Sequence, residues 1–289
     1  MGSSVEFSPH HRKTAMHANI RFAINRISAP RLSFPDYLAM CRRLGVSDIE
    51  IRNDLNGVEI SNGTLAAQLR AATAEAGITI RSINALYPFD VFDTGLQQRA
   101  VQLAAYARDC GAQALVLCPL NRRDDTRTAS QRQQELIHAL KQLKPILDDH
   151  GISGLVEPLG FEECALRRKS EAVTAIYAAA GERHFRLVHD TFHHYLAGED
   201  IFFPELTGLV HISGVESTPL ASREMRDGHR VLVGSADRLG NIPQLKELLA
   251  RGYQGVVSFE AFANDIMEAA DSETLLQNSM DYIHQQLAG

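Results

Sequence analysis

Four side chains of metal-ligand type lie at or near the ends of four apolar runs in the second half of the chain. The runs are ISGLVE (152–157), FRLVHD (185–190), LVHIS (209–213) and VVSFE (256–260), and they carry Glu157, Asp190, His211 and Glu260. Successive members of this set are 33, 21 and 49 residues apart, which is too far for a local metal-binding motif. Only a fold that brings the ends of the four runs together can make them one site.

The chemistry of such a site is set by three carboxylates and one imidazole. Carboxylates that share a buried site repel one another unless a cation compensates their charge. Oxygen-rich ligands with one nitrogen and no thiolate suit Mn²⁺, Mg²⁺, Co²⁺ or Zn²⁺, and ligand type alone does not choose among them. We expect one divalent ion, with Mn²⁺ as the first choice. The alternative is that each residue is a polar strand end that faces solvent.

Other polar residues at or beyond the apolar runs suit recognition of substrate hydroxyl and carbonyl groups, although each position alone is equally compatible with a structural role. His193 lies three residues beyond Asp190, in what we expect to be a loop over the site. Strand alternation turns Asp190 inward and His189 outward, so His189 is expected to be structural. The predicted substrate-binding residues are Asn25, Arg52, Asn84, Glu163, His193 and Arg230.

The elements that must position these residues are visible as short, β-branched apolar runs separated by helical patterns. Several helical patterns end in glycine directly before the next run, which is a common helix-stop signal. Eight alternating units predict an α/β fold, a single-domain (β/α)₈ TIM barrel over residues 20–289, with functional residues at the carboxyl ends of its strands. The eight runs are 20–25, 48–52, 78–84, 114–119, 152–157, 185–190, 209–213 and 256–260.

An open doubly wound sheet is the alternative arrangement. It usually carries a glycine-rich phosphate loop after the first strand, whereas the first run here is followed by RISAPRLS, which has no glycine. Residues 1–19 lack the apolar core of a signal peptide, and we expect a disordered or vector-derived tail there. The tail contains His10, His11 and His17, which are not expected to contribute to function.

The composition of the 289-residue chain narrows the classes of partner. A formal net charge of −6 disfavours nucleic acid, which requires a basic face. No apolar run approaches the roughly 18 residues that a membrane span needs. Four cysteines without a Cys-x-x-Cys pair suit a reducing compartment. We therefore expect a cytoplasmic protein with a small-molecule partner, leave a homo-oligomer open, and expect Cys118 and Cys164 to be packing residues.

Five segments carry a resemblance to a known family. They are RSINAL (81–86), VEPLGF (156–161), LVHDTFHHYLAG (187–198), VHISGVE (210–216) and the stretch from RVLVG to SFEAF (230–262). Together they resemble the sugar isomerase and epimerase barrels related to xylose isomerase, over essentially Ile20 to the end. Within that family the resemblance is greatest to the inosose isomerases, which act on a keto-cyclitol in inositol catabolism.

The resemblance implies roles for individual residues. Glu157 and Glu260 would form the acid–base pair, and His193 and Glu163 would contact substrate oxygens. The metal would be held by Glu157, Asp190, His211 and Glu260.

One loop departs from the family pattern. Relatives often carry Gly-x-Gly before the last helix, whereas this chain reads VGSADRLGNIP (233–243), with Arg238 as a further difference. Because this loop faces the substrate mouth in the family, the resemblance predicts the chemistry better than the substrate.

We therefore predict a metal-dependent isomerase or epimerase of a keto-sugar or keto-cyclitol that transfers a proton through an enediolate. The alternative on the same metal is a dehydratase of such a compound, whose conjugated enone product would distinguish it. An apurinic endonuclease would need more metal ligands than these strand ends supply. A non-catalytic sugar-binding barrel would tolerate loss of the acid–base pair, yet both glutamates are present.

Overall fold

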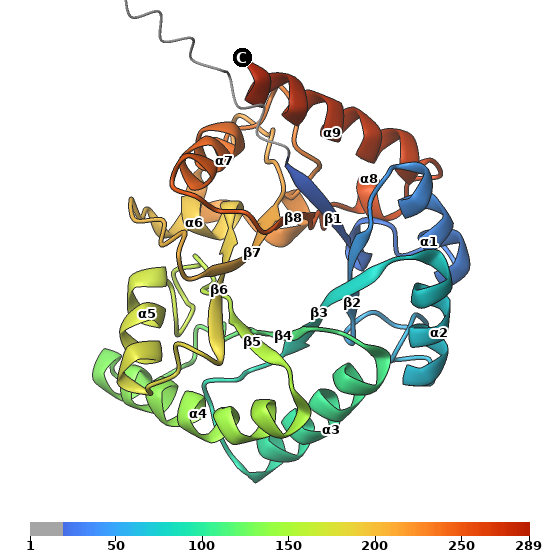
Figure 1. Ribbon diagram of the computed structural model, residues 1–289. Coiled ribbons are helices and arrows are strands. Elements are labelled where there is room, and N and C mark those ends of the chain that lie inside the picture. Colours follow the sequence, from blue (N-terminus) through green and yellow to red (C-terminus); the bar gives the residue numbers. More distant parts are fainter. Residues whose placement is uncertain (1–19) are drawn as a thin grey trace, which may run out of the picture.

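The computed structural model describes residues 20–289, so the tail expected at 1–19, with its three histidines, lies outside the described residues. Eight parallel strands pair in sequence order, and β8 pairs again with β1 to close a barrel. The helices form an outer ring around it (Figure 1). This confirms the predicted TIM barrel and excludes the open sheet, because none of the eight described strands is left at an edge.

The first and last residues of each strand lie within two residues of the ends of the corresponding predicted apolar run. The observed ends matter for the site, because β4, β5 and β8 each stop one residue before a polar side chain of interest. The strands are β1 Arg21–Asn25, β2 Asp48–Arg52, β3 Thr79–Leu86, β4 Ala114–Leu117, β5 Ser153–Val156, β6 Phe185–Asp190, β7 Thr207–Ile212 and β8 Val256–Phe259.

The helices follow the strands, and three short 3-10 helices lie in the loops. None of the helices described over residues 20–289 is long and apolar enough to cross a membrane. The α-helices are α1 Phe34–Arg43, α2 Ala66–Ala76, α3 Thr94–Cys110, α4 Ala129–His150, α5 Lys169–Ala178, α6 Thr191–Ala197, α7 Asn241–Ala250, α8 Asn264–Met267 and α9 Ser272–Ala288.

Side chains at the helix ends explain where the helices start and stop. The side chains of Asp93 and Thr128 accept hydrogen bonds from backbone amides in the first turns of α3 and α4. Gly111 and Gly151 end the same helices with φ values of 82° and 66°, the left-handed conformation that favours glycine. These stops return the chain to β4 and β5 with few connecting residues.

Two apolar layers flank the strands. The large outer cluster joins the outward faces of the strands to the helices. Inside the barrel, most members of a smaller cluster lie two residues before a polar strand-end residue and therefore point to the same face. That inner cluster consists of Ala23, Ala114, Val116, Leu155, Val188, Leu209 and Val256. The polar site thus rests on an apolar floor.

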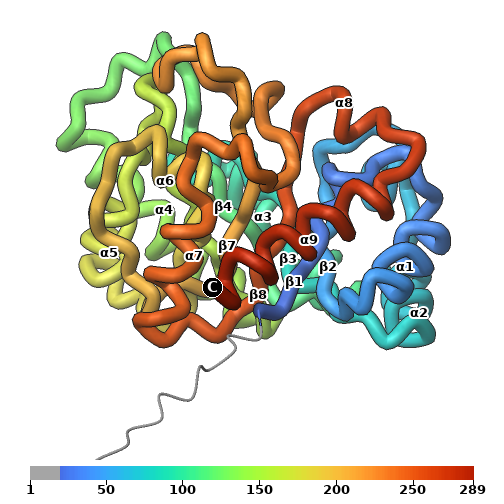
Figure 2. The backbone as a smooth tube through the Cα atoms, turned by 90° about the horizontal axis from the view of Figure 1, so that it is seen from above, coloured from blue at the N-terminus to red at the C-terminus, as the bar shows by residue number. Residues whose placement is uncertain are grey.

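Helix α9 covers the junction of β8 with β1 (Figures 1 and 2). Its residues Leu276, Met280 and Ile283 are buried. The ring of His284 on α9 lies 5.1 Å from the ring of Phe22 on β1. The last helix therefore closes the outer ring where the first and last strands of the barrel meet.

Candidate active site

One side chain from the carboxyl end of each strand joins a common network of polar contacts. Seven of these residues were predicted as site residues from the sequence. The eighth, Cys118, was expected only to pack, but its Sγ lies 3.3 Å from Glu157 Oε2. From β1 to β8 the eight residues are Asn25, Arg52, Asn84, Cys118, Glu157, Asp190, His211 and Glu260.

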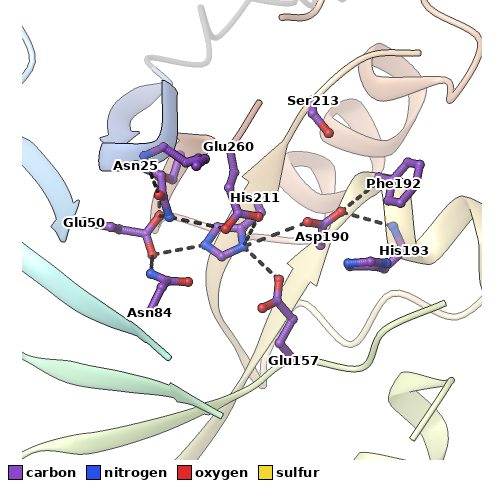
Figure 3. Close-up of polar contacts among 12 residues, drawn as sticks. Asn25, Glu50, Asn84, Glu157, Asp190, Phe192, His193, His211, Ser213 and Glu260 are labelled. Atoms are coloured by element: carbon purple, nitrogen blue, oxygen red, sulfur yellow. Dashed lines mark hydrogen bonds and ion pairs between the residues drawn. The ribbon is translucent and has the colours of Figure 1, made fainter. Parts of the chain in front are cut away.

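The four predicted metal ligands converge on one point. His211 Nδ1 lies 2.8 Å from Glu157 Oε1, 3.2 Å from Glu260 Oε2 and 3.9 Å from Asp190 Oδ2. One ligand atom from each of the four residues lies within 4.8 Å of all the others, and all four residues are buried. Figure 3 shows the imidazole at the centre, with these carboxylates on one side. The barrel therefore gathers a cluster that could hold a metal ion.

The opposite side of the imidazole faces a carboxylate that the sequence reasoning missed. Glu50 on β2 is fully buried, and its Oε2 lies 3.1 Å from His211 Nε2 (Figure 3). A signal was present: DIEIR alternates, so Glu50 shares the inward face with Arg52. A prediction based on strand ends alone misses Glu50, because this carboxylate lies inside β2, one layer deeper in the barrel.

The charges of the cluster are coupled through His211. Burial alone would lower the pKa of His211, but the charges of Glu260, Glu50 and Glu157 outweigh it and hold that pKa well above its usual value. Burial opposes ionisation of Glu50 and Glu260 as well. Attraction to His211 nevertheless lowers the pKa of Glu50 to about 2 and, with Arg230, keeps the pKa of Glu260 well below its usual value.

Two buried guanidiniums hold the carboxylates in place. Arg230 Nη2 lies 2.6 Å from Asp190 Oδ2 and 3.0 Å from Glu260 Oε2. Arg52 Nη1 lies 2.8 Å from Glu260 Oε1. The same two guanidiniums lie 4.9 and 5.2 Å from the centre of the Phe262 ring, which covers them. These two substrate-binding candidates thus contact the cluster itself.

The buried charge count fits a divalent cation. Four buried carboxylates, Glu50 included, face two buried guanidiniums, so two negative charges remain when His211 is neutral. The remaining acidic partners of the guanidiniums, Asp54 and Asp227, are about half exposed. A buried excess of charge is costly unless a counter-ion compensates it. The donor set and its charge therefore both match one divalent ion.

Asp190 uses its two oxygens for different tasks. Oδ1 accepts hydrogen bonds from Phe192 N at 2.8 Å and His193 N at 3.1 Å, which caps the start of α6. Oδ2 faces Arg230 and His211. The loop expected after β6 is therefore a helix, because Asp190 caps α6 directly at the strand end.

His193 is placed on α6 beside the cluster rather than in a loop as expected (Figure 3). Its ring lies 5.1 Å from the rings of both Phe161 and Phe192. Among the described residues, its buried Nδ1 has no hydrogen-bond partner. A buried polar atom without a partner is costly. A substrate oxygen would satisfy it, as the predicted role of His193 requires.

Other predicted residues lie away from the cluster. Glu163 lies in the β5–α5 loop, where its Oε1 is 3.7 Å from Arg123 Nε and 3.8 Å from Arg226 Nη2. It contacts none of the four ligand candidates, so its substrate-binding role stays a prediction. Arg238 donates to the carbonyl oxygen of Leu220 at 2.9 Å and braces the β7–α7 loop.

His189 packs outside the barrel, as strand alternation predicted. Its Nδ1 lies 2.8 Å from Lys169 Nζ on α5, and its Nε2 lies 2.9 Å from Gln244 Oε1 on α7. The side chains of Lys169, His189 and Gln244 are all buried. This chain of contacts fastens β6, and with it Asp190, to two helices.

Comparison with known proteins places this geometry in a known group. The family described as the xylose isomerase-like TIM barrel matches residues 38–286. A crystal structure of a xylose isomerase domain-containing protein from Salmonella typhimurium LT2 is 31% identical, with a TM-score of 0.84 over 91% of this chain and 97% of that chain. A search of curated proteins found no match to this sequence.

Two further solved structures share the fold at lower identity. The crystal structure of an IolI protein with a bound zinc atom is 19% identical, with a TM-score of 0.80 over 93% of this chain and 98% of that chain. A structure of L-ribulose 3-epimerase is 17% identical, with a TM-score of 0.68 over 93% of this chain and 94% of that chain. At these identities the likeness establishes the fold alone.

Proposed function

The chain belongs to the xylose isomerase-like TIM barrel family, and from this premise we propose that it is a divalent-metal-dependent isomerase or epimerase of a keto-sugar or keto-cyclitol. One observation carries the proposal. Glu157 and Glu260 lie 2.8 and 3.2 Å from the same nitrogen of His211, in a buried cluster of metal-ligand type. Two carboxylates beside one point are what proton removal and return at one substrate carbon require.

Neighbours of the same fold support this choice of reaction. One carries a zinc atom, and others are an L-ribulose 3-epimerase and a D-psicose 3-epimerase crystallised with D-tagatose. Their identities to this chain are below 20%, so they support the reaction class and leave the substrate open. Together with the sequence resemblance to inosose isomerases, they make 2-keto-myo-inositol the first substrate to test and inositol catabolism the first pathway.

Metal binding and proton transfer would both be carried out by residues of the cluster. A divalent cation held by Glu157, Asp190, His211 and Glu260 would stabilise negative charge on the substrate ketone and its neighbouring hydroxyl. One glutamate removes the proton from the carbon between those groups. The other returns a proton to the opposite face or to the neighbouring carbon.

The substrate would be oriented by donors around the cluster. Arg52 and Arg230 already hold Glu260, and Arg230 also holds Asp190, so these arginines would fix the carboxylate geometry and present further N–H groups to substrate oxygens. His193 lies beside the same cluster. The side-chain amides of Asn25 and Asn84 already donate to Glu50, so their substrate-binding role stays a prediction. The substrate-binding role of Glu163 stays a prediction from the family resemblance. A cytoplasmic location and a homo-oligomer likewise stay predictions.

The experiment that tests the function is a proton-exchange assay. The purified protein is incubated with Mn²⁺ and 2-keto-myo-inositol in D₂O and followed by NMR. We expect deuterium beside the ketone together with a shifted ketone position. An ultraviolet-absorbing enone would identify the dehydratase instead. Absence of exchange with this compound and with open-chain ketoses such as fructose and tagatose would refute the proposal.

A further inference from the structure

We propose that Glu50 is a positioning residue that keeps the proton of His211 on Nε2 and so presents Nδ1 to the proposed cation. The inference rests on the proposed metal-dependent function, because it concerns how one of the four ligands is oriented. It concerns a residue outside the ligand set, in the layer below it. His211 stands between Glu50 on one side and Glu157, Asp190 and Glu260 on the other (Figure 3).

The surroundings of Glu50 consist of hydrogen-bond donors. Its Oε2 accepts from Ser82 Oγ at 2.5 Å and from Asn84 Nδ2 at 2.9 Å. Its Oε1 accepts from Asn25 Nδ2 at 3.3 Å and from Ser258 Oγ. With His211 Nε2 at 3.1 Å, five polar groups converge on the two oxygens. An ionised carboxylate, which offers only acceptors, satisfies all five.

The choice of ring nitrogen follows from this arrangement. Because an ionised Glu50 can only accept, Nε2 must carry a hydrogen to make the 3.1 Å contact. In the neutral imidazole the other nitrogen then has a free lone pair. That nitrogen, Nδ1, is the one that lies 2.8, 3.2 and 3.9 Å from the three ligand carboxylates. Glu50 thus makes His211 a ligand on the correct side.

A purely structural role does not account for the position of Glu50. Within the described residues, no lysine or arginine lies within ion-pair distance of Glu50, and its one ion-pair contact is His211. Interiors of such barrels are usually filled by bulky branched side chains, and a buried carboxylate is costly without compensation. Carboxylates behind metal-bound histidines are a recurrent outer-shell device, and their loss typically weakens metal affinity by about 10–100-fold.

The test combines metal affinity with the state of the histidine ring. Zinc is bound to ¹⁵N-histidine-labelled protein, and a long-range ¹H–¹⁵N spectrum identifies His211 through its absence in His211→Asn. We expect Nε2 to be protonated and Nδ1 to carry the zinc. Calorimetric titration of zinc and Mn²⁺ into Glu50→Gln should show affinity reduced by about 10–100-fold.

The matched control is Glu59→Gln. Glu59 is another almost fully buried carboxylate, paired with Arg26 at 2.8 Å, and it has no contact with the cluster. This variant should bind zinc like the wild type, with unfolding curves recorded for both variants. If Glu50→Gln fails to fold, the wild-type ring spectrum decides alone.

Two results would overturn the inference: zinc on Nε2 of His211, or equal zinc affinity in wild type and a folded Glu50→Gln. A wild type that binds no divalent ion would overturn both this inference and the proposed function. The expected ring state in a protein without D₂O exchange would refute the function and leave the role of Glu50 standing.

Discussion

Glu260 is the residue of the cluster whose carboxylate contacts both buried guanidiniums. Oε1 lies 2.8 Å from Arg52 Nη1, and Oε2 lies 3.0 Å from Arg230 Nη2 and 3.2 Å from His211 Nδ1. The two guanidiniums fix the plane of this carboxylate. A proton-transfer group held in this way needs little rearrangement before it reacts.

Replacing Glu260 with glutamine should remove turnover while the barrel persists. The amide keeps the shape and one acceptor oxygen but cannot take up a proton, so we expect the exchange rate to fall by at least about 100-fold. The D₂O assay measures the rate, and circular dichroism checks the fold. The control is Glu273→Gln on α9, which removes the carboxylate partner of the exposed Arg43 on α1. Wild-type turnover in Glu260→Gln would contradict the acid–base assignment.

The sequence predicted the strand-end residues because their positions obey one geometric rule. Glu157, Asp190, His211 and Glu260 are far apart in the chain, yet parallel strands place their carboxyl ends at one end of the barrel. Glu50 escaped this rule because it lies inside its strand, where only alternation with Arg52 marks it as inward. Cys118 escaped because a thiol looks like a packing residue until its contact with Glu157 is seen.

At the scale of elements, α6 depends on close approach of the β5–α5 loop. A Cβ on Gly160 would lie 2.1 Å from the backbone oxygen of His193 and 2.8 Å from Leu196 Cβ. Contacts this short cannot be relieved by a side-chain rotation alone, because one partner is backbone. The absence of a side chain at Gly160 therefore sets where α6, and with it His193, packs.

Gly160→Ala should displace α6 and with it His193. We expect lower thermal stability and a lower kcat/KM, measured by calorimetry and the exchange assay, because overpacking typically costs about 1–3 kcal/mol. Gly228→Ala is the matched control, since a Cβ there meets nothing within 4 Å. Equal stability and activity in both variants would show that α6 does not need this close approach.

The layer between β6 and its helices contains a lysine whose ionisation should appear in stability. Burial lowers the pKa of Lys169 to about 7, whereas the unfolded chain restores its ordinary value near 10.5. The folded protein therefore binds fewer protons between these two values, so stability rises with pH across that window and is lowest below pH 7. The charge of Glu199 raises the pKa of Lys169 but does not outweigh burial. Burial and the charge of Lys169 together keep the pKa of His189 well below its usual value.

Lys169→Met should remove this dependence. Urea unfolding between about pH 7 and pH 9 should show wild-type stability rising relative to the variant by up to about 1.4 kcal/mol per pH unit. The difference between the two proteins isolates Lys169 from other titrating groups. Parallel curves for wild type and variant would show that Lys169 titrates normally in the folded state.

The strands were predictable to within two residues because a fully enclosed parallel sheet requires continuous apolar runs. Loops and short helices were not. The segment after β6 was expected to be a loop, yet Asp190 starts α6 at once, since its side chain is used as a cap. Nothing in the spacing alone distinguishes a carboxylate that caps a helix from one that only faces a site.

At the scale of the whole molecule, the excess of buried negative charge around the cluster predicts how the protein responds to metal removal. After treatment with a chelator, added Mn²⁺ should raise the melting temperature, and the rise should grow with concentration. An ion at about 100 times its Kd adds about 2.7 kcal/mol. Calorimetry measures the shift, and K⁺ at matched ionic strength is the control. Equal effects of the two ions would speak against a specific divalent site.

Asp190 connects the stability gained from a bound ion to the folding of α6. One carboxylate caps α6 and faces the proposed cation, so the two equilibria share a group and are thermodynamically linked. Linkage is reciprocal. The free energy by which a bound ion stabilises the start of α6 equals the free energy by which a folded α6 increases the affinity for the ion. Because His193, a proposed substrate contact, lies on α6, ion binding and substrate binding should then affect each other.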